Sequence, residues 1–400
     1  MRPPVVESRI EAPYAAWIEI RLDHLLHDLR ALKAFCPAQT GSSGYLERAE
    51  VTGLQPVQTE VLAVIKANAY GHGLLQIARA LDGKVRYLGV SSLRELLELK
   101  ENHVQTPVFV FGRLAEPELR AALMDGVTLS VSSLDEALEI SAVSGVLKRR
   151  TPVHMKVDTG MGRFGIPFRD ALKTIEKIAA LPALELEGLY THFPTAEIDD
   201  GFAEKQLLDF ALLTGALERK NIRFRYRHSA NSAGILKRPH PLMNMVRPGL
   251  LLYGIHPDPA LKPLIQTLPV LSLKSRILLV KNLAAGETAG YGREFSAKKN
   301  TRIAMLAVGY SHGYPFNAAR AAEVLLRGKR CKLAGRISMD YMAVHLGDTE
   351  AARDEEVTLI GECQGDQITV EEVAGWAGTI PYEIVTGLLN NLPRVYIATP

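Results

Sequence analysis

The 400-residue sequence lacks the marks of several protein classes. Its three cysteines, Cys36, Cys331 and Cys363, lie far apart and form no C-x-x-C pair. This argues against a disulfide framework or a cysteine metal cage and favours a reducing compartment. The first residues contain prolines and acids where a signal peptide needs an apolar segment, and no apolar run reaches the ~18 residues of a membrane span. We therefore expect a cytoplasmic protein with no membrane segment and no bound metal.

The sequence also has little net charge. The formal value is +3, which is too small and too evenly spread to indicate a nucleic-acid partner. Hydrophobic residues make up 47% and charged residues 23%, as expected for a globular protein with a sizeable core. Because one compact domain rarely holds 400 residues, two domains are expected.

Strand-like apolar runs alternate with helical stretches over the first two-thirds of the chain. The runs begin at Val61, Tyr87, Val108, Val127, Val153, Leu186, Phe224 and Met245. Amphipathic segments such as Ser92–Asn102, Ser133–Val143 and Arg169–Leu181 lie between them, with acids near their starts. Eight such units predict an α/β fold, a (β/α)8 TIM-like barrel. An open doubly wound sheet has the same alternation and remains the alternative.

The two ends of the chain depart from this alternation. Residues 17–35 predict a strand followed by a helix that opens at Asp23, and residues 37–58 resemble a long surface insertion. After Leu268 the pattern becomes strands separated by glycine-rich turns, with one helix at Thr369–Gly378. We therefore divide the chain into a barrel domain, 1–267, and a C-terminal mostly-β domain, 268–400.

Polar residues gather at the ends of the predicted barrel strands. They are Lys66 with Tyr70, Lys156 with Asp158, His192, Asn231 with Ser232, and Arg247. The active site of such a barrel lies at the carboxyl ends of its strands. Because each desolvated polar group is costly unless it is paired, five sets at one rim predict a functional site.

Lys66 ends an otherwise apolar strand. A lysine among apolar neighbours and other cations has a lowered pKa, and its neutral amine can attack a carbonyl. The alternative is a strand-end lysine that reaches out to water. Tyr70, Ser232 and the backbone of Gly249 and Leu250 offer donors for a phosphate, and this favours pyridoxal 5'-phosphate (PLP) bound to the lysine.

Two further features have competing interpretations. Arg247 fits a partner for the PLP ring nitrogen, since guanidinium only donates hydrogen bonds, but it could equally pair a barrel carboxylate.

Gly160–Gly165 reads G-x-G-x-x-G, a dinucleotide fingerprint, with Glu185 and Glu187 about 20 residues further on. We discount that interpretation because Arg163 is bulky and because the segment follows the fifth strand; Arg163 could bind a carboxylate instead.

The sequence resembles the PLP-dependent alanine racemases over nearly its whole length. AVIKANAYGHG, at Ala63–Gly73, matches that family's PLP-attachment motif. The other matching segments follow in family order: WIEIRLDHLLHDLRALK, HMKVDTGMGRFG, GLYTHFPTAE, HSANSAG, VRPGLLLYGI, SLKSRI, AGYGREF, GRISMDYM and TIPYEI.

This resemblance implies an isomerase that acts on alanine as a homodimer with shared active sites. Lys66 and Tyr291 would be the two proton-transfer bases, with Tyr291 donated by the other subunit. The implied PLP ligands are Lys66, Tyr70, His192, Asn231, Ser232, Arg247, Gly249, Leu250 and Tyr382. Arg163 and Met339 would bind the substrate, and Lys156 matches a lysine that is often carbamylated in the family.

Racemisation itself favours two bases. A proton must leave one face of Cα and arrive on the other, so two groups must flank that carbon. Free lysine and tyrosine side chains both have pKa values near 10.

Other functions remain open. The same fold also supports a serine or broad-specificity racemase, and a non-catalytic PLP-homeostasis protein resembles the barrel alone. A related two-domain decarboxylase and an NAD-dependent enzyme are more remote. His312 and Pro381 stand where the family commonly has aspartate and asparagine, and these departures bear on access to the site and on rate.

Overall fold

The computed structural model describes residues 13–39, 59–240, 242–388 and 391–398. Most of the predicted insertion at 37–58 lies outside the described residues; its first three positions continue helix α1 (Leu22–Gln39). The chain forms two compact units. One is Leu22–Leu268, and in the other the N-terminal residues through Arg21 join Pro269 onward.

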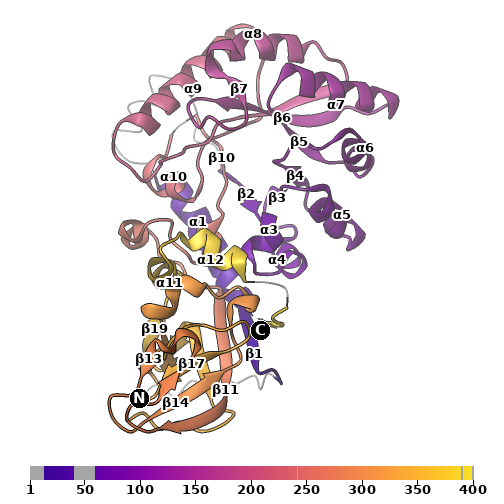
Figure 1. The fold of residues 1–400 in the computed structure, drawn as a ribbon. Coiled ribbons are helices and arrows are strands. Elements are labelled where there is room, and N and C mark those ends of the chain that lie inside the picture. The colour runs from indigo at the N-terminus through magenta and orange to yellow at the C-terminus, as the bar shows by residue number, and fades with distance from the viewer. Residues whose placement is uncertain (1–12, 40–58, 241, 389–390, 399–400) are drawn as a thin grey trace, which may run out of the picture. The chain divides into compact units, whose positions relative to one another are not determined.

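Eight parallel strands form the first unit, as the sequence predicts (Figure 1). They are β2 (Glu60–Val64), β3 (Tyr87–Val90), β4 (Val108–Val110), β5 (Thr128–Val131), β6 (Thr151–Asp158), β8 (Leu184–Tyr190), β9 (Tyr226–His228) and β10 (Met245–Val246). The short strand β7 (Ile166–Pro167) pairs with β6 beside this series. The eight runs read as nearly continuous apolar segments because parallel strands are buried on both faces.

The strands nearly close into a barrel. β10 pairs with β2, and two backbone hydrogen bonds join the last two strand regions: Asn244 N to Arg227 O at 3.1 Å and Arg247 N to Ala230 O at 3.0 Å. An open doubly wound sheet would leave both edge strands apart, so that alternative is wrong. Closure places all the strand ends at two rims, and the predicted site lies at one of them.

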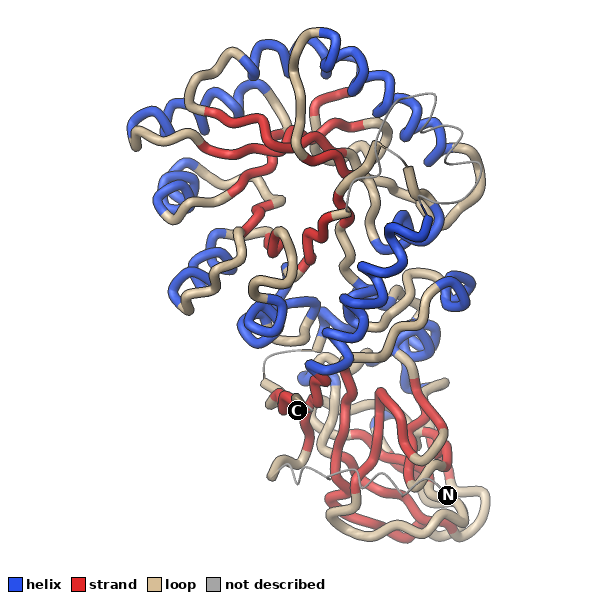
Figure 2. The backbone as a smooth tube through the Cα atoms, turned by 180° about the vertical axis from the view of Figure 1, so that it is seen from behind, coloured by secondary structure: helices blue, strands red, loops and turns tan. Residues whose placement is uncertain are grey.

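Helices cover the outside of the strands (Figure 2). They are α3 (Lys66–Tyr70), α4 (Leu74–Leu81), α5 (Leu93–Glu101), α6 (Glu116–Met124), α7 (Leu134–Val146), α8 (Phe168–Ala179), α9 (Phe202–Arg219) and α10 (Ser232–Lys237). Serines cap two of them: Ser92 accepts the Glu95 N–H and Ser133 accepts the Glu136 N–H. These caps satisfy donors that a helix start leaves open. The three helices predicted from amphipathic spacing are confirmed as α5, α7 and α8.

The second unit is mostly β-structure. Its strands are β1 (Ala16–Arg21), β11 (Leu271–Leu283), β12 (Thr288–Ala289), β13 (Phe295–Ser296), β14 (Thr301–Leu306), β15 (Glu323–Leu326), β16 (Lys329–Lys332), β17 (Met342–His345), β18 (Glu356–Cys363), β19 (Asp366–Ile368) and β20 (Arg394–Ile397). Its helices are α11 (Val370–Ala377) and α12 (Pro381–Gly387), where the sequence predicts one helix.

Strand β1 belongs to this β unit. It pairs antiparallel with β11 and parallel with β20, so both of its edges are hydrogen-bonded there. The division into 1–267 and 268–400 places this strand with the barrel, because a local pattern reveals a strand but not its distant partners. The domain limits themselves stay a prediction.

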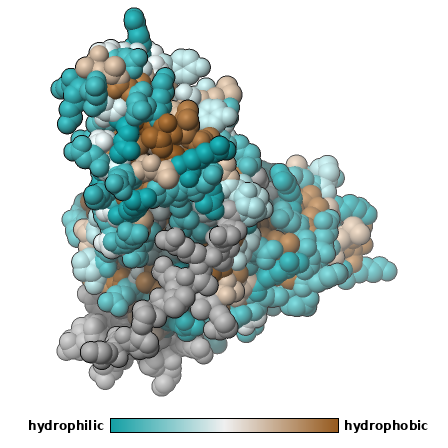
Figure 3. All heavy atoms as spheres, turned by 90° about the horizontal axis from the view of Figure 1, so that it is seen from below, coloured by the Kyte–Doolittle hydropathy of each residue, from teal (hydrophilic) through white to brown (hydrophobic). Residues whose placement is uncertain are grey.

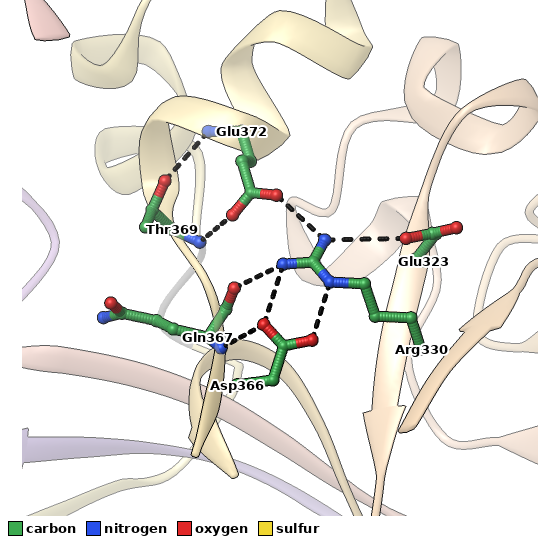
Figure 4. Close-up of polar contacts among 6 residues, drawn as sticks. All are labelled: Glu323, Arg330, Asp366, Gln367, Thr369 and Glu372. Atoms are coloured by element: carbon green, nitrogen blue, oxygen red, sulfur yellow. Dashed lines mark hydrogen bonds and ion pairs between the residues drawn. The ribbon is translucent and has the colours of Figure 1, made fainter. Parts of the chain in front are cut away.

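Arg330 ties the β15–β16 hairpin to the segment around α11 (Figure 4). Its guanidinium holds Asp366 through Nε at 2.9 Å and Nη2 at 3.2 Å, and it donates to Gln367 O at 2.6 Å. Glu372 accepts from Nη1 at 2.9 Å, and its carboxylate also accepts the Thr369 N–H at the start of α11. Because 31% of the Arg330 side chain stays exposed, solvent screens these pairs and each contributes little to stability.

The view in Figure 3 shows a largely hydrophilic surface with hydrophobic side chains in small separate groups. None of the described helices combines the length and apolar composition needed to cross a bilayer. Within the described ranges, no group of three or more His, Cys, Asp or Glu side chains is arranged to hold a metal ion.

Candidate active site

Lys66 follows the first barrel strand and starts α3. Its side chain is half-buried, and burial together with the nearby Arg163 charge lowers its pKa, against a smaller opposing effect of Glu95. A lowered pKa increases the fraction of neutral, nucleophilic amine at a given pH. The structure thus gives Lys66 the electrostatic setting that the sequence predicts.

The backbone after Lys66 is left-handed. Ala67, Asn68, Ala69 and Tyr70 have φ values of 53–54°, and Gly71 continues at 78°. A left-handed turn costs L-residues roughly 1–2 kcal/mol each, so it persists only where the surroundings enforce it. The turn carries Tyr70 back toward the rim, where its hydroxyl reaches the backbone of Gly249.

His72 is one of the groups that hold this turn. Its Nδ1 lies 3.0 Å from Ala69 O and 2.9 Å from Tyr70 O, so it carries the proton and donates to both carbonyls. The fully buried ring stacks on Tyr253, with centroids 4.2 Å apart. The Tyr253 hydroxyl in turn donates to Val64 O, in the strand that leads to Lys66. His72, near the end of the AVIKANAYGHG motif, therefore helps to hold the left-handed turn behind Lys66.

Replacing His72 with phenylalanine should lower the free energy of unfolding by about 1–3 kcal/mol, because two buried carbonyls lose their donor while the ring packing is kept. Denaturant unfolding of the apoprotein measures this. Amide exchange at Gly71 and Gly73, which close the turn through Ala67 O and Asn68 O, should speed up. Unchanged exchange at both amides would show that His72 does not hold the turn.

Ser232 and Gly249 form a compact polar cradle. The Ser232 Oγ accepts the N–H of Gly249 at 3.1 Å and that of Leu251 at 3.3 Å, and Ser232 and Leu250 are buried. A Cβ on Gly249 would lie 2.6 Å from the Tyr70 hydroxyl, so only glycine admits this approach. The structure brings together Tyr70, Ser232, Gly249 and Leu250, four of the five residues predicted to hold the phosphate; Tyr382 is the fifth.

Arg247 lies buried at the end of β10. Its Nη2 donates to Thr191 O and Ser229 O, both at 2.9 Å, and lies 3.2 Å from His192 Nδ1. Burial lowers the pKa of Arg247 to about 10, which leaves it charged at neutral pH. Burial and the Arg247 charge hold the pKa of His192 well below its usual range, so His192 is neutral. The alternative of a simple pair with a barrel carboxylate is wrong, since the described partners are carbonyls and imidazoles.

Lys156 stands beside these cations. Burial, Arg163 and Arg247 together lower its pKa to about 8. Its Nζ lies over two rings, 5.6 Å from the centroid of Phe164 and 5.7 Å from that of Tyr190. A neutral amine fraction is what carbamylation needs, and that modification stays a prediction.

The G-x-G-x-x-G segment folds onto its own chain. Asp158 accepts the N–H groups of Gly160 at 2.9 Å and Gly162 at 3.0 Å, so these donors are taken. At Gly165, with φ of 128°, a Cβ would lie 2.7 Å from Asp158 N. The glycines therefore serve a tight loop that presents exposed Arg163, which supports discounting the dinucleotide interpretation.

Asn231 has a structural task. Its side chain accepts the Gly234 N–H at 2.9 Å and caps α10, the helix that begins with Ser232. Its amide nitrogen lies 3.4 Å from Phe193 O. Asn231 thus positions Ser232, and its predicted contact with PLP stays a prediction.

Three predicted site residues lie in the β unit. Tyr291 sits between β12 and β13 with 71% of its surface exposed, and Met339 is 55% exposed. Tyr382 is half-buried in α12, where Pro381 occupies the first helical turn.

His312 accepts the Gly309 N–H at 3.1 Å, a bond that an aspartate could also make. Both departures from the family pattern are therefore compatible with the local backbone.

Comparison with known proteins agrees with this geometry. Residues 48–257 match the family model "Alanine racemase, N-terminal domain", and residues 270–396 match "Alanine racemase, C-terminal domain". The alanine racemase of Desulforamulus reducens is 37% identical over 388 residues, covering 95% of this chain and 98% of that protein. That of Carboxydothermus hydrogenoformans is 35% identical, covering 95% and 99%.

Solved structures give the same result. The alanine racemase of Clostridium difficile 630 aligns with a TM-score of 0.87 at 29% identity and covers 97% of both chains. The enzyme from the D-cycloserine producer Streptomyces lavendulae aligns with a TM-score of 0.87 at 30% identity, covering 98% of this chain and 99% of that one. With both domains matched in order, the chain belongs to the alanine racemase family of PLP-dependent isomerases.

Proposed function

We propose that this protein interconverts L-alanine and D-alanine with PLP, using Lys66 and Tyr291 as its two bases. The observation that carries the proposal is the convergence at one barrel rim of Lys66, the Ser232–Gly249 cradle and buried Arg247. Family membership over both domains supports the alanine assignment. A cytoplasmic location remains the expectation from cysteine usage.

The chain's own residues suit PLP. Gly249 leaves space that a Cβ would fill against Tyr70, and this is the close backbone approach that a phosphate cradle needs. Arg247 would donate to the ring nitrogen and neutral His192 would lie beside the ring, while Lys66 would attach the cofactor. When bound, PLP withdraws electrons from Cα of the amino acid and makes its proton removable.

Each base would act at one face of Cα. Lys66 would take or return the proton through Nζ, helped by the lowered pKa of its amine. The phenol of Tyr291 would do the same from the opposite face. Arg247 would donate a hydrogen bond without receiving a proton, because guanidinium has no acceptor. This limits charge delocalisation and favours return of the proton to Cα.

Substrate recognition would rest on Arg163 and Met339. Exposed Arg163 can bind a carboxylate through two parallel hydrogen bonds. Tyr291 is a large aromatic with 71% of its surface exposed, which fits a residue that completes a site in a second copy of the chain. We therefore propose a homodimer in which each β unit supplies Tyr291 to the partner's barrel.

The decisive experiment measures D-amino acid formation from a panel of L-amino acids with PLP-loaded enzyme. L-alanine should give the highest kcat/KM. A higher value for L-serine would replace the alanine assignment with the serine alternative. PLP binding without any racemisation would favour the non-catalytic homeostasis protein.

A further inference from the structure

The interior of the barrel is unusual in composition. Branched aliphatic residues normally fill the interior layers of such barrels. Here Tyr87, Phe109, His154, Tyr190 and His228 are in mutual ring contact, and both histidines are fully buried. Buried imidazoles are costly unless they are hydrogen-bonded, so this arrangement calls for a physical reason.

The hydrogen bonds that join Arg247, His228 and His154 all donate in the same direction, away from Arg247. Arg247 Nη1 lies 2.7 Å from His228 Nδ1, and because guanidinium can only donate, Nδ1 must accept. His228 then carries its proton on Nε2, which lies 2.8 Å from His154 Nδ1 and donates to it. His154 is left with its proton on Nε2. Burial lowers the pKa of both histidines, so both rings are neutral.

The chain of contacts ends at a carboxylate. His154 Nε2 lies 3.6 Å from Glu187 Oε2, beyond hydrogen-bond distance, and the Tyr87 hydroxyl donates to the same oxygen at 2.5 Å. Burial raises the pKa of Glu187, but hydrogen bonding and the charge of Arg86, 3.6 Å away, outweigh it and the net shift is downward. Glu187 is therefore an ionised carboxylate that is only 8% exposed.

Gly188 gives the His154 ring room to approach the backbone of strand β8. A Cβ at this position would lie 2.3 Å from His154 Cγ. The glycine beside Glu187 therefore lets the imidazole lie flat against strand β8.

We propose that Glu187 is the remote counter-charge of Arg247, acting through His154 and His228. This inference rests on the proposed function, in which Arg247 faces the PLP ring nitrogen. Glu187, His154 and His228 are positioning residues: none would touch the substrate. The polarised chain keeps the buried guanidinium charged and orients it: Arg247 donates to His228, His228 donates to His154, and the Nε2 proton of His154 faces the Glu187 charge 3.6 Å away without a hydrogen bond.

The positive charge of Arg247 at one end and the negative charge of Glu187 at the other explain why the hydrogen bonds between them all run in one direction. Arg247 has no carboxylate among its described hydrogen-bond partners, yet a buried cation needs compensation. Two neutral histidines between a cation and an anion align their dipoles with the field, and such chains strengthen cooperatively. A purely structural role would require the hydrogen bonds but not the negative charge.

The first test is ¹⁵N NMR of histidine-labelled apoprotein, which is independent of racemase activity. Signals are assigned through His154→Gln and His228→Gln. Both histidines should be neutral and protonated on Nε2 only. A doubly protonated ring, or a proton on Nδ1 of either residue, overturns the proposal, and racemase activity plays no part in that result.

The second test is a double-mutant cycle between Glu187→Gln and Arg247→Lys. Glu187→Gln alone should lower kcat about ten-fold, but by less than two-fold when Arg247 is already lysine. Glu187→Asp, which keeps the charge, should recover part of the loss. Glu185→Gln is the matched control, since Glu185 lies on the same strand and is exposed.

The outcomes separate two explanations. If the kcat loss of the double variant equals the product of the two single losses, Glu187 does not act through Arg247. That result would show a merely structural role for Glu187 and overturn the proposal. The visible absorbance of bound PLP in Glu187→Gln gives a second readout and should shift as the ring nitrogen's partner changes. If Glu187→Gln does not fold, the NMR measurement on the unaltered chain can still overturn the proposal, because a reversed tautomer in either histidine would break the connection from Arg247 to Glu187.

Discussion

Replacing Lys66 with alanine should lower kcat for alanine racemisation by about 10⁴-fold, because it removes both the attachment point for PLP and one of the two bases. The substitution should leave the fold intact, since the half-buried Lys66 side chain has no hydrogen-bond partner among the described residues whose loss would leave a buried group unpaired. The visible absorbance band of lysine-bound PLP should vanish.

The measurement combines kinetics with chemical mapping. Borohydride reduction of PLP-loaded enzyme, followed by peptide mass spectrometry, should place the cofactor on Lys66 in the unaltered chain and nowhere in the variant. Lys173→Ala, an exposed lysine on α8, is the control and should leave both readouts unchanged. PLP found on another lysine in the unaltered enzyme would sink the attachment assignment.

Replacing Tyr291 with phenylalanine should lower kcat by about 10²- to 10⁴-fold, with little change in PLP content. Only the hydroxyl is lost, and Tyr291 is too exposed for its loss to disturb packing. In deuterated solvent one enantiomer of alanine should still exchange its Cα hydrogen through Lys66, while the other should not. This asymmetry follows from assigning one base to each face.

Tyr14→Phe, an exposed tyrosine elsewhere in the β unit, is the control. Mixing Lys66→Ala with Tyr291→Phe should restore activity, because a heterodimer then contains one site with both residues intact. Heterodimers that form but stay inactive would contradict the shared site. Equal exchange of both enantiomers in Tyr291→Phe would contradict the two-base assignment.

Much of the fold is readable in the sequence because its signals are local. The eight barrel strands are apolar runs in a regular series with helices, and the eight-unit count predicts closure. Strand β1 is also locally visible, but its partners β11 and β20 lie at the other end of the chain. Pairing over such a separation leaves no local trace, so the sequence predicts the strand β1 but not its partners.

Within the site, too, residues with a local sequence signal can be predicted, whereas residues defined by distant contacts cannot. Lys66 and Arg247 stand out because charged residues in apolar strands are unusual. Glu187 stands out only as an acid that follows the glycine-rich segment, because its partner Tyr87 is 100 residues away and the contact forms only when the barrel closes. His72 sits in a motif that the sequence singles out, yet its task depends on φ values and on stacking with Tyr253. For His154, the sequence offers one signal: it lies two residues before Lys156 in the same strand, so both side chains face the same side of the sheet.

The position of β1 between β11 and β20 has a consequence for synthesis on the ribosome. The barrel unit ends at Leu268, so all of its strands precede both partners of β1 in the chain and leave the ribosome before them. At typical elongation rates of ~5–20 residues per second, this apolar strand with two open edges waits roughly 10–50 s for β11 and roughly 20–75 s for β20. The β unit can be completed only when the last strand has been released, so translation order makes the barrel the first part to mature and the Tyr291-bearing unit the last.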